Sequence, residues 1–236
     1  MNNLDLKNIA ENLLDTFFKA GEIAKKIGNR GVKITIKPDK SPVTDGDLEV
    51  DLILRSKIKK TTKEIPIISE ETVNLGVKNK HKTFWLIDPI DGTKDYIKKK
   101  SEYTLNAALI VNFEPAIGIV YAPAKKRLFY SYGKGFAYEI NSSKRKLSCK
   151  SRNDKKVIAL ANSEETPDEI LDIYKKNNVT ETIRMSSSLK FCILAAGEAD
   201  IYAATARAYE WDIAAGHAIL EHAGGSITTH EGKKFC

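Results

Sequence analysis

The chain has 236 residues, 42% of them hydrophobic, so it can bury a sizeable core and is not a disordered, collagen-like or coiled-coil protein. Its formal net charge of +7 comes with lysine runs such as Lys98–Lys100 that lack interleaved aromatic residues, which favours a solvated surface over nucleic-acid binding. No apolar run approaches the roughly 18 residues of a membrane helix, and the N-terminus lacks the regions of a signal peptide. We therefore expect a cytoplasmic protein without an integral membrane segment. Cys149, Cys192 and Cys236 are widely separated, which predicts free thiols.

The first 150 residues predict two helices followed by a sheet. Apolar residues recur at helical spacing up to Ile27, and Gly28 then supplies a stop signal. The predicted elements are a helix over residues 4–27, a strand over 32–36, a helix over 47–58, strands over 65–68 and 84–87, and an antiparallel meander over 104–149. Both short apolar strands end in acidic residues.

The last third of the chain alternates strands with helices. The predicted elements are strands over residues 157–161, 183–185 and 201–203, helices over 167–177, 188–196 and 211–223, and the start of a strand over 226–228. The change of pattern near residue 150 predicts two abutting subdomains, 1–150 with most of the acidic motifs and 151–236 with an αβα arrangement.

The sharpest local motif is WLIDPIDGT, residues 85–93. A buried strand runs into Asp88, Pro89 is expected to fix a turn, and Asp91 can then place its carboxylate on the same side as that of Asp88. Gly92 permits close backbone approach, and Thr93 opens a predicted helix whose free N–H groups lie beside the carboxylates. The motif therefore predicts a cradle for a metal-bridged phosphate. The alternative is that these are ordinary turn dipeptides and an ordinary helix cap.

Other acidic residues also stand at the ends of predicted elements. They are Glu70 and Glu71 after the strand at 65–68, Asp47 at the start of the second helix, and Asp212 at the start of the last helix. If these acids converge, like charges about 4 Å apart cost roughly 4 kcal/mol per pair at an effective dielectric of 20, so a cation is needed. Oxygen-only ligation favours Mg²⁺, with Mn²⁺ as an alternative, and the chemistry typical of such a site is phosphate ester hydrolysis.

At this point the sequence resembles a known family. The motifs LIDPIDGT, SPVTDGD, ISEE and EWDIAAGHAIL are similar to those of the inositol monophosphatase-like, lithium-sensitive, Mg²⁺-dependent phosphatases. The segments DGTKDYIKKKSEYTLNAALI and SSSLKFCILAAGEADIY resemble the CysQ branch, the 3'(2'),5'-bisphosphate nucleotidases. The resemblance covers almost the whole chain and implies a layered αβαβα sandwich.

The resemblance also implies a role for each site residue. The implied metal ligands, for two or three Mg²⁺ ions, are Glu70, Asp88, the main-chain carbonyl of Ile90, Asp91 and Asp212. The implied catalytic residues are Asp47 and Thr93, which would orient and deprotonate the attacking water, together with Glu70. The implied substrate-binding residues are Gly92, Thr93, Ser187, Lys190 and Asp212. Without the resemblance, Lys190 could equally be a solvated helix residue.

Three departures from the family pattern stand out. Where related nucleotidases have a Pro-Arg pair this chain has Ala203–Ala204, and the nearest arginine is Arg207. Asp45 and Gly46 replace the usual small residues and add a charge near the presumed water-activating acid. Family members generally continue past the position of Cys236 into another strand, so the last sheet is expected to lack an edge strand.

The expected activity is removal of the 3'-phosphate of adenosine 3',5'-bisphosphate, giving AMP and phosphate. Two alternatives stay open: an inositol or sugar monophosphatase of the same superfamily, and a catalytically impaired nucleotide-binding relative. The expected partner is a small phosphorylated substrate and not a nucleic acid, and the oligomeric state is left open. The resemblance also leaves open a peripheral association with the inner face of the cell membrane.

Overall fold

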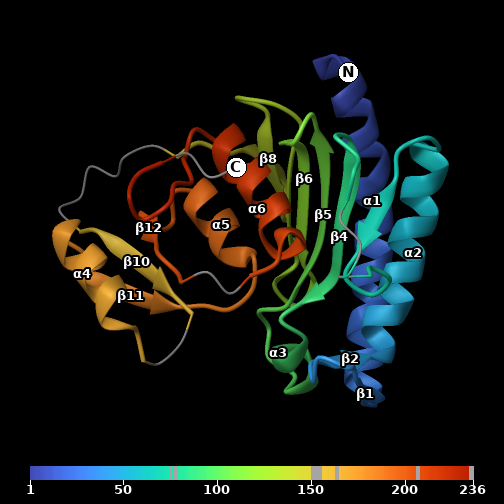
Figure 1. The fold of residues 1–236 in the computed structure, drawn as a ribbon, viewed down its shortest axis with the longest axis horizontal. Helices are drawn as coiled ribbons and strands as arrows, with labels where there is room; N and C mark the ends of the chain where they lie inside the picture. Colours follow the sequence, from blue (N-terminus) through green and yellow to red (C-terminus); the bar gives the residue numbers. More distant parts are fainter. Residues whose placement is uncertain (75, 77–78, 150–155, 163–164, 206–207, 234–236) are drawn as a thin grey trace.

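A computed structural model of the chain describes residues 1–74, 76, 79–149, 156–162, 165–205 and 208–233. Its layers run in the order αβαβα (Figure 1). The predicted layered sandwich is confirmed, as is the antiparallel meander over residues 104–149. Within the described residues, no helix combines the length and apolar character needed to cross a bilayer.

The central layer is a seven-stranded sheet. Its strands, in spatial order, are β3 (Ile67–Ser69), β4 (Phe84–Asp91), β5 (Thr104–Val111), β6 (Glu114–Ala122), β7 (Arg127–Ser131), β8 (Ala137–Ile140) and β9 (Lys144–Lys146). Only β3 and β4 run parallel, and every other neighbouring pair is antiparallel. The short 3₁₀ helix Pro123–Lys125 joins β6 to β7.

Helices cover both faces of this sheet. On one face lie α1 (Asn3–Arg30) and α2 (Asp45–Thr61), and on the other lie α5 (Leu189–Ala195) and α6 (Glu210–His222). Residues of β4 alternate between the two cores, because Trp85 packs towards α1 and α2 while Leu86 packs towards α5 and α6. A Cβ on Gly118 would lie 2.3 Å from the carbonyl oxygen of Ala215, so this glycine lets α6 lie directly on β6.

The last two layers, a small sheet and one helix, lie on the side of α5 and α6 that faces away from the seven-stranded sheet (Figure 1). A parallel three-stranded sheet has the order β11 (Glu181–Arg184), β10 (Ile158–Ala161) and β12 (Ile201–Tyr202), and α4 (Asp168–Lys176) covers it. The division of the chain at residue 150 stays a prediction.

Two local predictions are wrong, and one short strand was not predicted. Pro89 does not end the strand in a turn, because β4 continues to Asp91 and a bulge between Asp88 and Asp91 shifts its register. Residues 42–44, for which no element was predicted, form strand β2 (Pro42–Thr44), which pairs with β1 (Ile34–Ile36). The strand expected at 226–228 is no more than a single bridge at Thr228. The expectation about Cys236 concerns a residue outside the described part of the chain.

Candidate metal and phosphate site

Three carboxylates from distant parts of the chain meet at one end of β4. One ligand oxygen each from Glu70, Asp88 and Asp212 lies within 4.8 Å of the others. Glu70 directly follows β3, and its backbone N–H donates to the Ile87 carbonyl at 3.0 Å. This hydrogen bond continues the pairing of β3 with β4 and places Glu70 beside Asp88. Asp212 stands in the first turn of α6, which packs against β4, and its Oδ2 accepts from the backbone N–H of Tyr209 at 2.9 Å.

Asp91 lies on the same strand, beyond the bulge. Its Oδ2 accepts a hydrogen bond from the backbone N–H of Ser188, at the start of α5. Burial and then the charge of Asp212 raise the pKa of Asp91 to about 7, although the Lys190 charge opposes this. The structure thus brings Asp91 into the electrostatic neighbourhood of the three converging acids.

Asp88 shows most clearly that this cluster fits a cation. It is buried, and its Oδ1 has no hydrogen-bond partner among the described residues. Burial, and then the charges of Asp91 and Glu70, raise the pKa of Asp88 well above its usual range. A buried carboxylate surrounded by like charges is stabilised by a divalent cation, and the donors here are the hard oxygens that Mg²⁺ or Mn²⁺ prefers. The residues present therefore fit a metal, while their individual roles as ligands stay a prediction.

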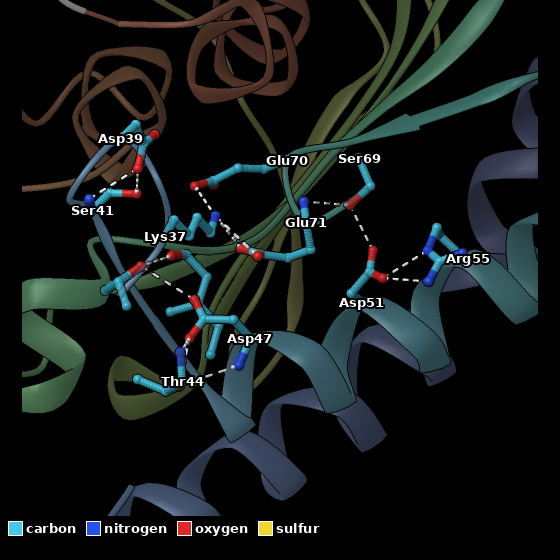
Figure 2. A network of polar contacts seen from close by, with 12 residues as sticks. Lys37, Asp39, Ser41, Thr44, Asp47, Asp51, Arg55, Ser69, Glu70 and Glu71 are labelled. Carbon is cyan, nitrogen blue, oxygen red and sulfur yellow. Dashed lines mark hydrogen bonds and ion pairs between the residues drawn. The ribbon is translucent and has the colours of Figure 1, made fainter. Parts of the chain in front are cut away.

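Lys37 is a member of the site that the sequence did not indicate. It follows β1, and its Nζ lies 3.0 Å from Glu70 Oε1 and 2.9 Å from Glu71 Oε2 (Figure 2). Burial alone would lower the pKa of Lys37, but its hydrogen bonds to Glu71 and Glu70 outweigh burial, so the pKa lies above the ordinary value of lysine. Burial raises the pKa of Glu71 to about 7 in spite of Lys37. The ammonium thus neutralises part of the acidic cluster.

Asp47 and Thr93 lie within hydrogen-bonding distance of each other, while their catalytic roles stay a prediction. Thr93 Oγ1 lies 3.2 Å from Asp47 Oδ1 and 3.1 Å from the carbonyl oxygen of Ile90. The other carboxylate oxygen accepts from the Thr44 N–H at 2.7 Å and from the Thr44 hydroxyl, in a capping box at the start of α2 (Figure 2). Burial raises the pKa of Asp47. Asp47 is therefore held in one orientation beside Thr93.

The added charge of Asp45 has its own partners. Its Oδ2 lies 2.7 Å from the Arg30 guanidinium, and its Oδ1 accepts from the Lys33 N–H at 2.9 Å. The structure therefore explains how this departure from the family pattern is accommodated.

The backbone beside Asp91 turns sharply into a short helix. Gly92 has a φ of 90°, the left-handed region, and caps α3 (Thr93–Ile97), which is only five residues long. The Gly92 and Thr93 amides thus follow directly on the acidic end of β4.

Lys190 is buried, with 5% of its surface exposed, so the alternative of a solvated helix residue is wrong. Its Nζ donates to the Ser187 carbonyl at 2.5 Å and lies 5.2 Å from the centre of the Tyr202 ring. Burial lowers the pKa of Lys190 to about 8, while the charges of Asp91 and Glu102 oppose the shift. Arg207 lies outside the described residues.

The chain is similar to known proteins over most of its length. The model of the Inositol monophosphatase family matches residues 5–236. The chain is 34% identical to the 3'(2'),5'-bisphosphate nucleotidase CysQ of Buchnera aphidicola, over 96% of this chain and 88% of that protein. It is also 34% identical to the CysQ nucleotidase of Salmonella typhimurium, over 87% and 83% of the two chains. The crystal structure of CysQ from Bacteroides thetaiotaomicron superposes with a TM-score of 0.73 at 32% identity, over 91% and 86% of the chains.

Proposed function

We propose a substrate and a cofactor for this chain, which belongs to the inositol monophosphatase family and is a phosphoric monoester hydrolase of the CysQ type. The proposed reaction is Mg²⁺-dependent removal of the 3'-phosphate of adenosine 3',5'-bisphosphate, giving AMP and phosphate. The observation that carries it is the buried Asp88 oxygen, which has no hydrogen-bond partner within the described part of the chain, at the point where Glu70 and Asp212 converge on Asp88.

The proposed ligands of the cation are all oxygen atoms. They are the carboxylates of Glu70, Asp88, Asp91 and Asp212 and the carbonyl of Ile90. When bound, Mg²⁺ neutralises the repulsion among these acids and stabilises the charge that develops on the phosphoryl group. The family is metal-dependent, and the choice of Mg²⁺ follows from the oxygen-only donor set.

Thr93 and Asp47 are proposed to handle the proton of the attacking water. The Thr93 hydroxyl can donate its proton to Asp47 Oδ1. Thr93 Oγ1 can then accept a hydrogen bond from the attacking water. As the water oxygen forms its bond to phosphorus, the bond from phosphorus to the 3'-oxygen breaks. One water proton moves to Thr93 while the Thr93 proton moves to Asp47, and the departing 3'-oxygen takes up a proton from solvent. The raised pKa of Asp47 favours this transfer.

The phosphate groups are proposed to occupy two subsites. The backbone amides of Gly92 and Thr93 would hold oxygens of the scissile phosphate, while Ser187 and Lys190 would bind the other phosphate. Because Lys190 is buried, an anion there would interact with its charge in a low dielectric, where the attraction is strong.

A substrate comparison tests this proposal. Phosphate release is measured with Mg²⁺ for adenosine 3',5'-bisphosphate, adenosine 3'-monophosphate and inositol 1-phosphate. We expect the bisphosphate to have the highest kcat/KM, by at least about tenfold, because only it fills both subsites. Comparable turnover of inositol 1-phosphate would overturn the nucleotidase assignment.

An inositol or sugar monophosphatase is the second candidate. The specific observation in its favour is Ala203–Ala204, which stands where related nucleotidases have a Pro-Arg pair. A chain that binds the bisphosphate without releasing phosphate would instead be a nucleotide-binding relative, and that result would contradict both enzymatic proposals.

A further inference from the structure

Three buried polar side chains form a closed ring of hydrogen bonds beside the acidic cluster. Thr104 and Asn106 lie on β5, and Ser188 immediately precedes α5, with exposed fractions of 0%, 1% and 2%. Ser188 Oγ lies 2.6 Å from Asn106 Oδ1 and 2.9 Å from Thr104 Oγ1. Asn106 Nδ2 closes the ring at 3.4 Å from Thr104 Oγ1. The ring therefore ties the start of α5 to the strand that neighbours β4.

The direction of each hydrogen bond follows from the chemistry of the atoms. Asn106 Nδ2 also lies 3.4 Å from the carbonyl oxygen of Thr104, which can only accept, so the nitrogen of the amide must face Thr104. Asn106 Oδ1 then accepts the proton of the Ser188 hydroxyl. Ser188 Oγ is left to accept the proton of the Thr104 hydroxyl. Each ring member both donates and accepts, so removing the Thr104 hydroxyl takes one hydrogen bond from Ser188 and one from Asn106.

The ring lies directly across the ladder from the acids of β4. In the pairing of β4 with β5, Asn106 stands opposite Asp88 and Thr104 stands opposite Asp91. The backbone N–H of Ser188, the third ring member, donates to Asp91 Oδ2. The ring thus ties Ser188, whose backbone N–H touches Asp91, to β5, the strand that pairs with the one carrying Asp91.

The backbone before Ser188 needs such an anchor. Ser187 has a φ of 58°, a left-handed conformation that a non-glycine residue keeps only where surrounding contacts hold it. The Ser187 hydroxyl donates to the Glu102 carbonyl, and the ring fixes the next residue. Together these contacts determine where the Ser188 N–H points.

We propose that Thr104, Asn106 and Ser188 are positioning residues that set the direction of the Asp91 carboxylate, and with it the affinity for a divalent cation. The inference rests on the proposed function in one respect, that Asp91 is a ligand. A carboxylate already held in its binding orientation loses less freedom when the cation binds. Loss of a partner that orients a metal ligand typically weakens metal affinity about 10- to 100-fold.

The first test needs no metal. Thr104→Val removes the hydroxyl while keeping the size and branching of the side chain, and Thr104→Ser keeps the hydroxyl as the matched control. We expect the hydrogen-exchange protection of the Ser188 amide to fall at least about tenfold in Thr104→Val and to stay within about threefold in Thr104→Ser. Unchanged protection in Thr104→Val overturns the proposal. If that variant does not fold, Ser188→Ala is compared with Ser188→Thr in the same way.

The second test is calorimetric titration of the metal-free protein with Mn²⁺. We expect Thr104→Val to bind about 10- to 100-fold more weakly than the wild type, and Thr104→Ser to bind within about threefold. If Thr104→Val reduces the hydrogen-exchange protection of the Ser188 amide but leaves the Mn²⁺ affinity unchanged, the positioning role is overturned and the proposed function still stands. Unchanged affinity in Asp91→Asn instead shows that the ligand set of the proposed function is wrong, so the two failures are distinguishable.

Discussion

Lys37 Nζ lies 3.0 Å from Glu70 Oε1, so the β1–β2 hairpin places a cation on one of the acids that converge with Asp88. Both side chains are largely buried, with 19% and 26% exposed, so their attraction is only partly screened. A divalent cation that binds Glu70 therefore competes with the ammonium for the same carboxylate.

This competition predicts the effect of Lys37→Gln. Without the ammonium, Glu70 and Glu71 repel each other, and the metal-free protein loses about 1–3 kcal/mol of stability. We expect saturating Mn²⁺ to raise the Tm of the variant more than that of the wild type, because it neutralises acids that no longer have a cation partner. Thermal unfolding with and without Mn²⁺ measures this, and Lys40→Gln on the same hairpin is the control. Equal rises in Tm for both variants would contradict the competition.

Loss of one proposed ligand is tested by Asp91→Asn. The amide keeps an oxygen that can accept the Ser188 N–H, so we expect the fold to survive, and the metal-free protein to be no less stable because one like charge is gone. Turnover should fall at least about 1,000-fold, as expected when a charged ligand is lost. The measurements are phosphate release and urea unfolding. Near-normal activity at ordinary Mg²⁺ would remove Asp91 from the ligand set.

The acidic site also predicts how metal-free stability depends on pH. The pKa of Asp91 rises on folding from 3.8 to about 7, and that of Glu71 from 4.5 to about 7. Between these values the folded state binds more protons than the unfolded state, so stability falls as the pH rises, by up to about 1.4 kcal/mol per pH unit and group. Burial lowers the pKa of His222 from 6.5 to about 4, which opposes this trend below about pH 6.5.

Urea unfolding in the presence of a chelator, from about pH 6.5 to about pH 8, measures the effect in the range where His222 no longer opposes it. We expect a falling stability in the wild type, a shallower fall in Asp91→Asn, and no fall with saturating Mn²⁺. A stability that rises with pH in metal-free protein would show that these acids are not protonated in the folded state.

Local sequence patterns located the acids better than they described the backbone between them. Asp88 and Asp91 lie in one short motif, and their chemistry could be read without knowing the fold. Pro89 nevertheless suggested a turn, because a proline is usually excluded from the middle of a sheet, whereas here a bulge accommodates it. Asp212 stood out by its position at the start of a predicted helix, but its convergence with Asp88 and Asp91 needed the family resemblance, since nothing local connects residues 121 or more positions apart.

Lys37 and Lys190 show what could not be predicted. Lys37 lies 33 residues before Glu70 and reaches it through a hairpin whose second strand was not predicted. Lys190 is buried because α5 lies between two sheets, and that burial follows from tertiary packing and not from the helical pattern of its neighbours.

The buried ammonium of Lys190 predicts a selective loss of affinity in Lys190→Met. The methionine keeps most of the apolar side chain but cannot meet an anion, so we expect KM for adenosine 3',5'-bisphosphate to rise at least about tenfold. KM for adenosine 3'-monophosphate should change little, because it lacks the second phosphate. Steady-state kinetics with both substrates tests this, and Lys100→Met, an exposed lysine paired with Asp95, is the control. Equal rises in KM for both substrates would show a general role in packing.

Thr93→Ala separates the handling of the proton from substrate binding. The alanine removes the hydroxyl that lies 3.2 Å from Asp47 and would orient the attacking water, so we expect kcat to fall about 100-fold or more while KM changes little. Thr93→Ser keeps a hydroxyl at the same position and should stay within about fivefold of wild-type kcat. Steady-state kinetics on the bisphosphate gives both constants. If Thr93→Ala instead raised KM and left kcat unchanged, Thr93 would act in binding the ground state, and the Asp47 pair would not carry the proton.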